Sequence, residues 1–170
     1  MLMLKNVMAR AVAVAVAAPA LALAVSTSAS ASTQSETVHW QNAATGKCLN
    51  WGNDVFGNYR LEPPGACDTS YHGWSQWKEV SVDGKYWTFR PDEPVNGDPN
   101  KMCLTSYNTL VYLETCQDGN WWQQWEEIWT PSGWKLQHRG AGQVANYFLD
   151  SDGSSTYTHA PNSGLYQVWH

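Results

Sequence analysis

Four cysteines are the residues whose type and spacing first suggest chemistry: Cys48, Cys67, Cys103 and Cys116. Cysteine side chains form disulfides or ligate metals such as zinc. In a chain with an export signal, an even number of cysteines is typical of disulfides, and four cysteines allow three pairings. A zinc site would need a CxxC pair or histidines at finger spacing, and the sequence has neither. We therefore predict two disulfides and no metal site.

Other short motifs lack the context that their chemistry needs. Residues 140–145 have a dinucleotide-like glycine spacing but do not open a helix in a βαβ unit. The segment that starts at Asp150 resembles a calcium loop, but its twelfth position is Pro161 instead of glutamate. Glu126 and Glu127 are neighbours on an expected strand and point to opposite faces. We expect no catalytic residues and no cofactor; the alternative is a glycoside hydrolase whose carboxylates come from distant loops.

The first 31 residues have the pattern of an export signal. Lys5 and Arg10 form a positive start, and residues 11–25 are an apolar stretch too short and too alanine-rich for a spanning helix. Residues 29–31 fit the small-x-small cleavage pattern. We predict a signal peptide over residues 1–31, a secreted, extracellular protein, and one domain over residues 32–170. An uncleaved membrane anchor is the alternative.

The composition of the remaining 139 residues limits the partners. Eight basic residues stand against fifteen acidic ones, a net charge of −7. Binding of a nucleic-acid backbone needs clustered lysine and arginine, so we exclude nucleic acid, and without the leader we expect no membrane insertion. All 11 tryptophans lie in this part of the chain. Such aromatic content excludes a disordered chain.

A short aromatic motif recurs three times along the chain. It consists of an aromatic residue, a polar residue, any residue and a tryptophan, at residues 74–77, 122–125 and 166–169. The closing tryptophans are 48 and 44 residues apart. The spacing indicates three repeats, at about 38–81, 82–129 and 130–170.

The cysteines follow the same repeats. All four occupy matching places in the first two copies, whereas Phe148 and Ala160 stand at those places in the third. The third copy therefore lacks both cysteines together. This joint absence supports pairing within each repeat, as Cys48–Cys67 and Cys103–Cys116.

The segments between the turns have β character. Residues 86–89, 110–113 and 134–136 are rich in β-branched, aromatic and leucine side chains and follow turn residues. No window has a helical period. The longest loop is predicted over Arg90 to Lys101, with three prolines. We predict an all-β fold whose three repeats close around a pseudo-threefold axis, because closure removes sheet edges.

With these repeats, the chain resembles the ricin B-type lectins, a β-trefoil family with a repeated Gln-x-Trp (QxW) motif. The motif is intact at residues 123–125 and 167–169, and Ser75 replaces the glutamine in the first copy. The resemblance spans about residues 38–170 and implies a β-trefoil of three QxW-type repeats that binds sugars. We assign the motif residues to the packing of each lobe: Gln123, Trp125, Gln167, Trp169 and Trp77.

The third repeat is closest to the actinohivin-like lectins, which bind high-mannose glycans. In that family an aspartate, a tyrosine and an asparagine contact sugar hydroxyls, and the matching residues are Asp150, Tyr157 and Asn162. His159 stands where the family often has leucine and joins the candidate site. A carboxylate accepts bonds from adjacent hydroxyls, an amide donates and accepts, and an aromatic ring covers the apolar sugar face. Alternatively, Asp150 and Asn162 are turn residues and Tyr157 is a buried strand residue.

The other two copies retain less of this pattern. Asn50 replaces the aspartate in the first copy, where Trp51 and Tyr59 are candidates for stacking. Thr105 replaces it in the second copy, where Tyr112 remains. We expect the best site in the third repeat, a weaker one in the first and a poor one in the second.

The sequence therefore predicts a secreted, non-catalytic lectin for neutral glycans or polysaccharides of mannose or galactose type. The alternative is a secreted β-trefoil protein-interaction module or hydrolase inhibitor with non-functional sugar sites. Its contact surface would be the loop from Arg90 to Lys101.

Overall fold

Short strands rich in β-branched and aromatic residues make up most of the described structure. The computed structural model describes residues 35–68, 70, 74–92, 101–140 and 146–170, all within one compact unit, Ser32–His170. The predicted signal peptide and residues 93–100 of the predicted loop lie outside the described residues. In chain order the strands are β1 (Ser35–His39), β2 (Cys48–Asn53), β3 (Tyr59–Gly65), β4 (Gln76–Ser81), β5 (Trp87–Pro91), β6 (Met102–Tyr107), β7 (Leu110–Thr115), β8 (Trp125–Thr130), β9 (Gly133–His138), β10 (Phe148–Ser151) and β11 (Thr156–His159).

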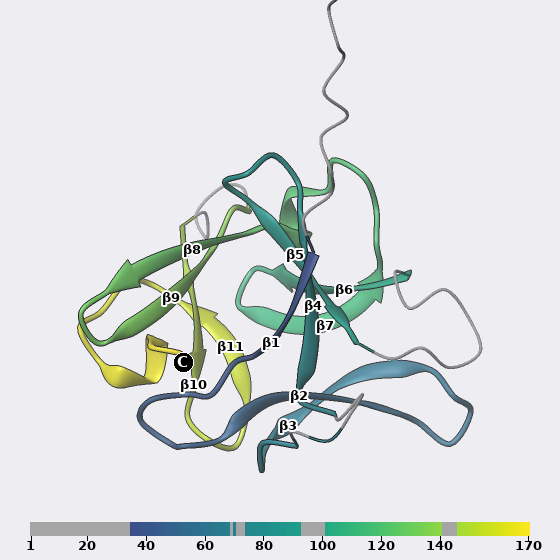
Figure 1. The fold of residues 1–170 in the computed structure, drawn as a ribbon, viewed down its shortest axis with the longest axis horizontal. Coiled ribbons are helices and arrows are strands. Elements are labelled where there is room, and N and C mark those ends of the chain that lie inside the picture. The colour runs from purple at the N-terminus through teal and green to yellow at the C-terminus, as the bar shows by residue number, and fades with distance from the viewer. Residues whose placement is uncertain (1–34, 69, 71–73, 93–100, 141–145) are drawn as a thin grey trace, which may run out of the picture. The chain divides into compact units, whose positions relative to one another are not determined.

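Each copy of the repeat contributes a hairpin with one strand segment before it and one after it (Figure 1). We call each folded copy a lobe, and we call the ring of segments outside the hairpins the barrel. The hairpins are β2–β3, β6–β7 and β10–β11. Two short 3-10 helices, η2 (Trp121–Gln123) and η4 (Leu165–Gln167), carry the motif glutamines of the second and third copies. The predicted strand segments 86–89, 110–113 and 134–136 largely coincide with β5, β7 and β9.

The remaining strands form a ring that closes through the third copy. The ladder runs β1-β4-β5-β8-β9. Trp169 then exchanges backbone hydrogen bonds of 2.9 and 2.8 Å with Trp134 of β9. His170 exchanges two bonds of 2.9 Å with Gln41, just after β1. The predicted all-β fold with pseudo-threefold symmetry, a β-trefoil, is thus confirmed.

The closing tryptophans form the centre of the hydrophobic core. Trp77, Trp125 and Trp169 are all completely buried. Each indole N–H donates to the backbone carbonyl of a leucine in the first strand of its copy's hairpin. The bonds are Trp77 to Leu49 at 2.8 Å, Trp125 to Leu104 at 2.9 Å and Trp169 to Leu149 at 3.1 Å. Every lobe is therefore tied to the barrel by the same bond.

The motif glutamines occupy buried positions suited to the structural role that we expect. Gln123 donates through Nε2 to the Thr115 carbonyl at 2.9 Å and accepts the Gln117 N–H at 2.8 Å. Gln167 makes the corresponding bonds to Ala160 and Asn162, at 2.9 and 3.0 Å. In the first copy, the shorter Ser75 donates to the Asp68 carbonyl at 2.7 Å.

Two disulfides join Cys48 to Cys67 and Cys103 to Cys116, which confirms the predicted pairing within each repeat. Loops of this size stabilise a fold by about 3 kcal/mol in the chain-entropy model. In the third copy, the buried ring of Phe148 occupies one cysteine position. One detail of the predicted loop is wrong, because Arg90 and Pro91 belong to β5 and pair with Lys78 and Trp77 of β4. Proline is tolerated there because it ends the strand.

A buried and a half-buried glutamate meet inside the barrel. Glu79 of β4 is only 5% exposed, and Glu127 comes from β8. Burial, followed by the charges of Glu127 and Glu36, raises the pKa of Glu79 to about 9. Burial also raises the pKa of Glu127. Its neighbour Glu126 points outward, 3.2 Å from Lys85, so the two adjacent glutamates lie on opposite faces as predicted.

We expect the glutamate pair to make the fold less stable as pH rises. Glu79 holds a proton in the folded state up to about pH 9, whereas an ordinary glutamate releases it near 4.5. Between these pH values the free energy of unfolding falls, by at most about 1.4 kcal/mol per pH unit for one proton. The Glu79→Gln variant should show a shallower fall in urea unfolding measured at pH 5, 7 and 9. Glu126→Gln, the same substitution outside the barrel, should keep the wild-type slope. Equal slopes for all three proteins would contradict the prediction.

Candidate functional site

The third hairpin brings Asp150 and Tyr157 together. They are directly opposite each other on β10 and β11, so their side chains share one face of the sheet. Asp150 is 3% exposed, and its Oδ1 atom is buried without a hydrogen-bond partner among the described residues. A buried carboxylate oxygen is normally bonded, because leaving it unbonded costs about 1–3 kcal/mol. The site therefore holds an unused acceptor.

Tyr157 is half-buried beside this carboxylate. Burial raises the pKa of Tyr157, and the charges of Asp150 and Asp152 and a contact with Asp150 raise it further. The phenol therefore keeps its proton at neutral pH and can act as a donor. Tyr166 lies close enough to raise this pKa as well.

Tyr166 is a residue that the sequence analysis did not assign to the site. It is 50% exposed and is the first residue of the closing motif. The equivalent Trp74 in the first copy is 48% exposed. An aromatic residue at this place in all three copies was the available signal, although the analysis used it only to define the repeats.

The other two predicted residues of this lobe lie at its rim. His159 is exposed, lies two positions beyond Tyr157 on β11 and thus shares its face. Asn162 is exposed, and its Oδ1 accepts the Gly164 N–H at 2.8 Å. Its backbone N–H donates to Gln167, and its carbonyl accepts from Lys135. Asn162 therefore has the turn role that we considered as its alternative, and only its Nδ2 has no partner in the described structure.

The first lobe differs from the predicted arrangement. Asn50 lies opposite Glu62, whereas Tyr59 lies opposite Asn53, because this hairpin is longer than the third one and its turn begins only after Asn53. Trp51 is buried, with Tyr59 packed against it at 5.9 Å, so it presents no ring for stacking. Glu62, whose carboxylate accepts a bond from Arg60, is thus a neighbour of Asn50 that the sequence analysis missed.

The residues that follow the hairpin leucines have different hydrogen-bonding states in the three lobes. The Oδ1 of Asn50 is buried and has no partner within the described ranges, as for Asp150. Thr105 lies opposite Tyr112, and its buried hydroxyl donates to the Cys103 carbonyl at 3.1 Å. The first and third lobes therefore keep an unused acceptor at the same place, and the second has none there.

Two cavities lie elsewhere on the fold. One, of about 490 Å³, runs along β1, and the other, of about 350 Å³, lies beside the Cys103–Cys116 disulfide. Across the described ranges, no group of three or more His, Cys, Asp or Glu side chains is arranged to hold a metal ion. None of the described helices has the length and apolar character needed to cross a membrane.

Comparison with known proteins supports the fold. A designed threefold-symmetric protein, ThreeFoil, is similar to the structure with a TM-score of 0.60 and 17% identity. The match covers 78% of this chain and 95% of ThreeFoil. No family model matches the sequence, and no curated protein does. At this identity the similarity shows a β-trefoil and nothing about a ligand.

We expect Asp150→Asn to stabilise the protein in the absence of ligand, by about 1 kcal/mol, because it removes a buried charge with an unbonded oxygen. The measurement is urea unfolding at pH 7. Asp152→Asn is the matched control and should lower stability, because the Asp152 carboxylate accepts the Ser154 and Ser155 N–H groups at 2.7 and 2.8 Å. These bonds lower the pKa of Asp152 in the folded state. Loss of stability in Asp150→Asn would instead indicate a structural turn residue.

Proposed function

We propose that the protein is a lectin of the ricin B type that binds neutral glycans of the mannose or galactose type and is not an enzyme. The observation that carries this proposal is the unbonded Oδ1 of Asp150 beside Tyr157. Adjacent hydroxyls of a pyranose would supply the missing donors, and the half-exposed ring of Tyr166 would cover its apolar face.

Electrostatics favour a neutral sugar. Asp150 and Asp152 both act on Tyr157, so an anionic sugar would meet two carboxylates. The region after residue 31 also carries a net charge of −7. Acidic polysaccharides are therefore the disfavoured ligands.

A single site of this kind would bind weakly, with a dissociation constant of about 1 mM. Asn50 in the first lobe offers a second unused acceptor, without the charge. Its neighbours on the hairpin and in the motif are Glu62 and the half-exposed Trp74. Two lobes that engage one branched glycan would raise the avidity without new contacts.

The proposed compartment is extracellular. Two disulfides are typical of exported proteins, because reducing compartments keep thiols unpaired. Secretion also agrees with glycans or polysaccharides as the partners. We expect mass spectrometry of the exported protein to find Ser32 at its N-terminus with both disulfides formed. An intact leader in the recovered protein would contradict this part of the proposal.

The binding test is a glycan array followed by titration calorimetry with the best glycan. Asp150→Asn should weaken binding at least tenfold, because the neutral amide loses the charge-assisted bonds to the sugar hydroxyls. Asp118→Asn, the same charge change at an exposed position in the second copy, should bind as the wild type does.

The outcomes separate the lobes and the alternatives. Binding that persists in Asp150→Asn and is lost in Asn50→Ala would move the main site to the first lobe. Failure of the folded wild-type protein to bind any glycan would overturn the lectin proposal. That result would favour the protein-interaction module with contacts from the loop after β5.

A further inference from the structure

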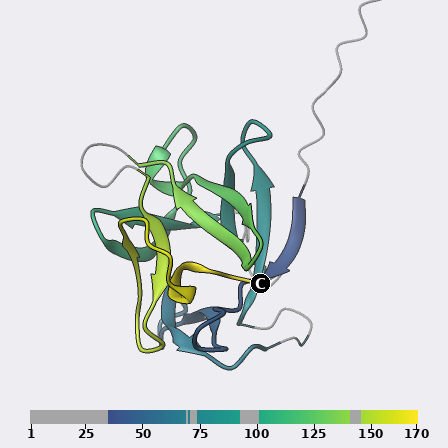
Figure 2. The same ribbon diagram turned by 90° about the vertical axis from the view of Figure 1, so that its left-hand side faces the viewer.

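Strand β1 is an edge of the main sheet. It ends the strand order and pairs on one side with β4. Figure 2 shows it at the outer border of the fold, with β4 on its inner side. In the first two copies, the segment after the closing tryptophan forms a full ladder, β4 with β5 and β8 with β9. In the third copy, Val168, Trp169 and His170 instead contact the residues just after β1, namely Ala43, Asn42 and Gln41.

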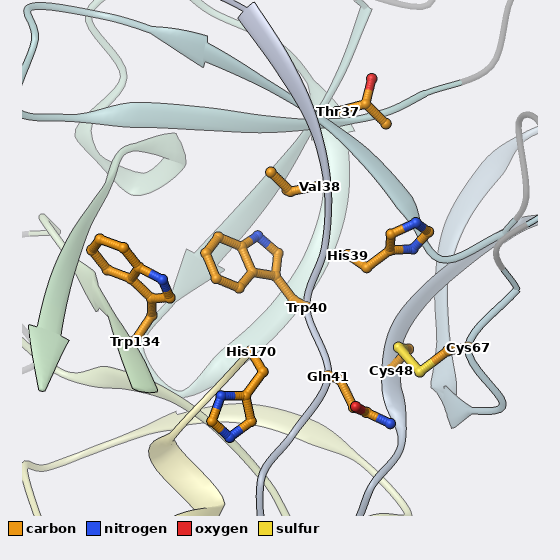
Figure 3. Close-up of a pocket in the computed structure, with 9 residues that line it drawn as sticks. All are labelled: Thr37, Val38, His39, Trp40, Gln41, Cys48, Cys67, Trp134 and His170. Atoms are coloured by element: carbon orange, nitrogen blue, oxygen red, sulfur yellow. A yellow bond between two sulfur atoms is a disulfide. The ribbon is translucent and has the colours of Figure 1, made fainter. Parts of the chain in front are cut away.

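A groove follows this edge. The cavity of about 490 Å³ is lined by five consecutive residues, Thr37 to Gln41, together with Trp134, His170 and the Cys48–Cys67 disulfide. Successive side chains of a strand point to opposite faces, so a cavity that touches all five runs along the strand's edge. Figure 3 shows Val38 and Trp40 pointing toward Trp134, whereas His39 and Gln41 point the other way.

The edge presents backbone hydrogen-bonding groups. Gln41 exchanges both of its backbone bonds with His170 on this side. Backbone groups of a strand alternate in direction with each residue. His39 and Thr37 therefore direct their N–H and C=O groups to the same edge as Gln41. No strand of the described part of the chain pairs with them there.

The groove also contains an unused donor. Trp40 is 4% exposed, and its indole Nε1 has no hydrogen-bond partner among the described residues. A buried indole N–H normally finds an acceptor. An extended strand could bond to the backbone groups of this edge, and an acceptor side chain on that strand could bond to the Trp40 N–H.

Strand β1 has one device that usually protects an edge, the charge of Glu36 on the inward face opposite Glu79, but it lacks three others. Its sequence, Ser-Glu-Thr-Val-His, contains no proline and no lysine, and its ladder with β4 is regular over all five residues. Natural edge strands use prolines, lysines or bulges to prevent pairing with another chain.

We propose that β1 pairs antiparallel with β1 of a second copy of this chain, about a two-fold axis at Thr37. Thr37 then lies opposite Thr37 of the second copy, and Ser35 lies opposite the second copy's His39. Three hydrogen-bonded residue pairs form, each exchanging two backbone bonds. Threonine pairs are favourable cross-strand neighbours, and like charges do not face each other.

The same register supplies the missing acceptor. The second copy's Glu36 lies opposite Val38 and diagonal to Trp40, on the face that lines the groove. Diagonal neighbours on a sheet are within reach of long and aromatic side chains. The carboxylate can accept the Trp40 N–H. This complementarity of β1 with itself favours a second copy over an unrelated strand.

Sedimentation velocity over a concentration series tests the dimer. The protein is expressed as the full chain and studied as exported. Thr37→Pro removes the edge N–H and should weaken dimerisation at least tenfold. Thr37→Val is the matched control, because both variants lose the hydroxyl bond to Asp92 but only the proline loses the N–H. A wild-type protein that stays monomeric throughout the series, or equal association of both variants, would overturn the proposal.

Crosslinking tests the register and does not depend on the folding of the proline variant. Residues opposite each other in an antiparallel ladder have Cα atoms about 5.5 Å apart, within the range that a disulfide spans. Thr37→Cys should therefore form a covalent dimer under mild oxidation. Thr115→Cys, an exposed position at the end of β7, should remain monomeric. Equal crosslinking of the two variants would overturn the two-fold register.

Discussion

The bond from each closing tryptophan to its hairpin leucine is the constraint on which the structure depends. Trp169 donates to Leu149 from a completely buried position, and the other two copies repeat this contact. Because a buried indole needs an acceptor, the bond sets where each hairpin lies on the barrel. The residue after the leucine is Asp150 in the third copy. The core contact therefore positions the candidate site directly, one residue away.

The three lobes show how one scaffold supports different surfaces. A disulfide holds each of the first two lobes, whereas buried Phe148 fills a cysteine position in the third. Buried glutamines bridge two backbone segments in the second and third copies, whereas Ser75 bonds to the Asp68 carbonyl and to the His39 ring in the first. The packing tolerates these exchanges because the tryptophan bond is retained in all three. The three copies also differ in the hairpin residues that follow the leucines, and these residues give each lobe its hydrogen-bonding groups.

Several buried polar groups keep unused hydrogen-bonding capacity, and they lie at separate places. Asp150 and Asn50 do so in two lobes, Glu79 inside the barrel and Trp40 at the sheet edge. Each such group lowers the free energy of unfolding, and together they lower it noticeably because its net value is small. The lobe oxygens and the indole N–H are the groups whose missing partners we propose that another molecule supplies. The glutamate pair instead keeps a proton in the folded state, and this proton makes the stability of the fold depend on pH.

The sequence by itself determined the threefold repeat, the β-trefoil and the disulfide pairing, because these follow from spacing along the chain. The resemblance to a lectin family grouped Asp150 with Tyr157, and the structure shows that they lie directly opposite each other on β10 and β11. Only the tertiary structure decided that Glu62 lies opposite Asn50, because residue types do not show how far the two strands run before the turn. It likewise decided the approach of Tyr166 to Tyr157 and the meeting of Glu79 with Glu127. These contacts join segments far apart in the chain, and the closure of the barrel brings them together.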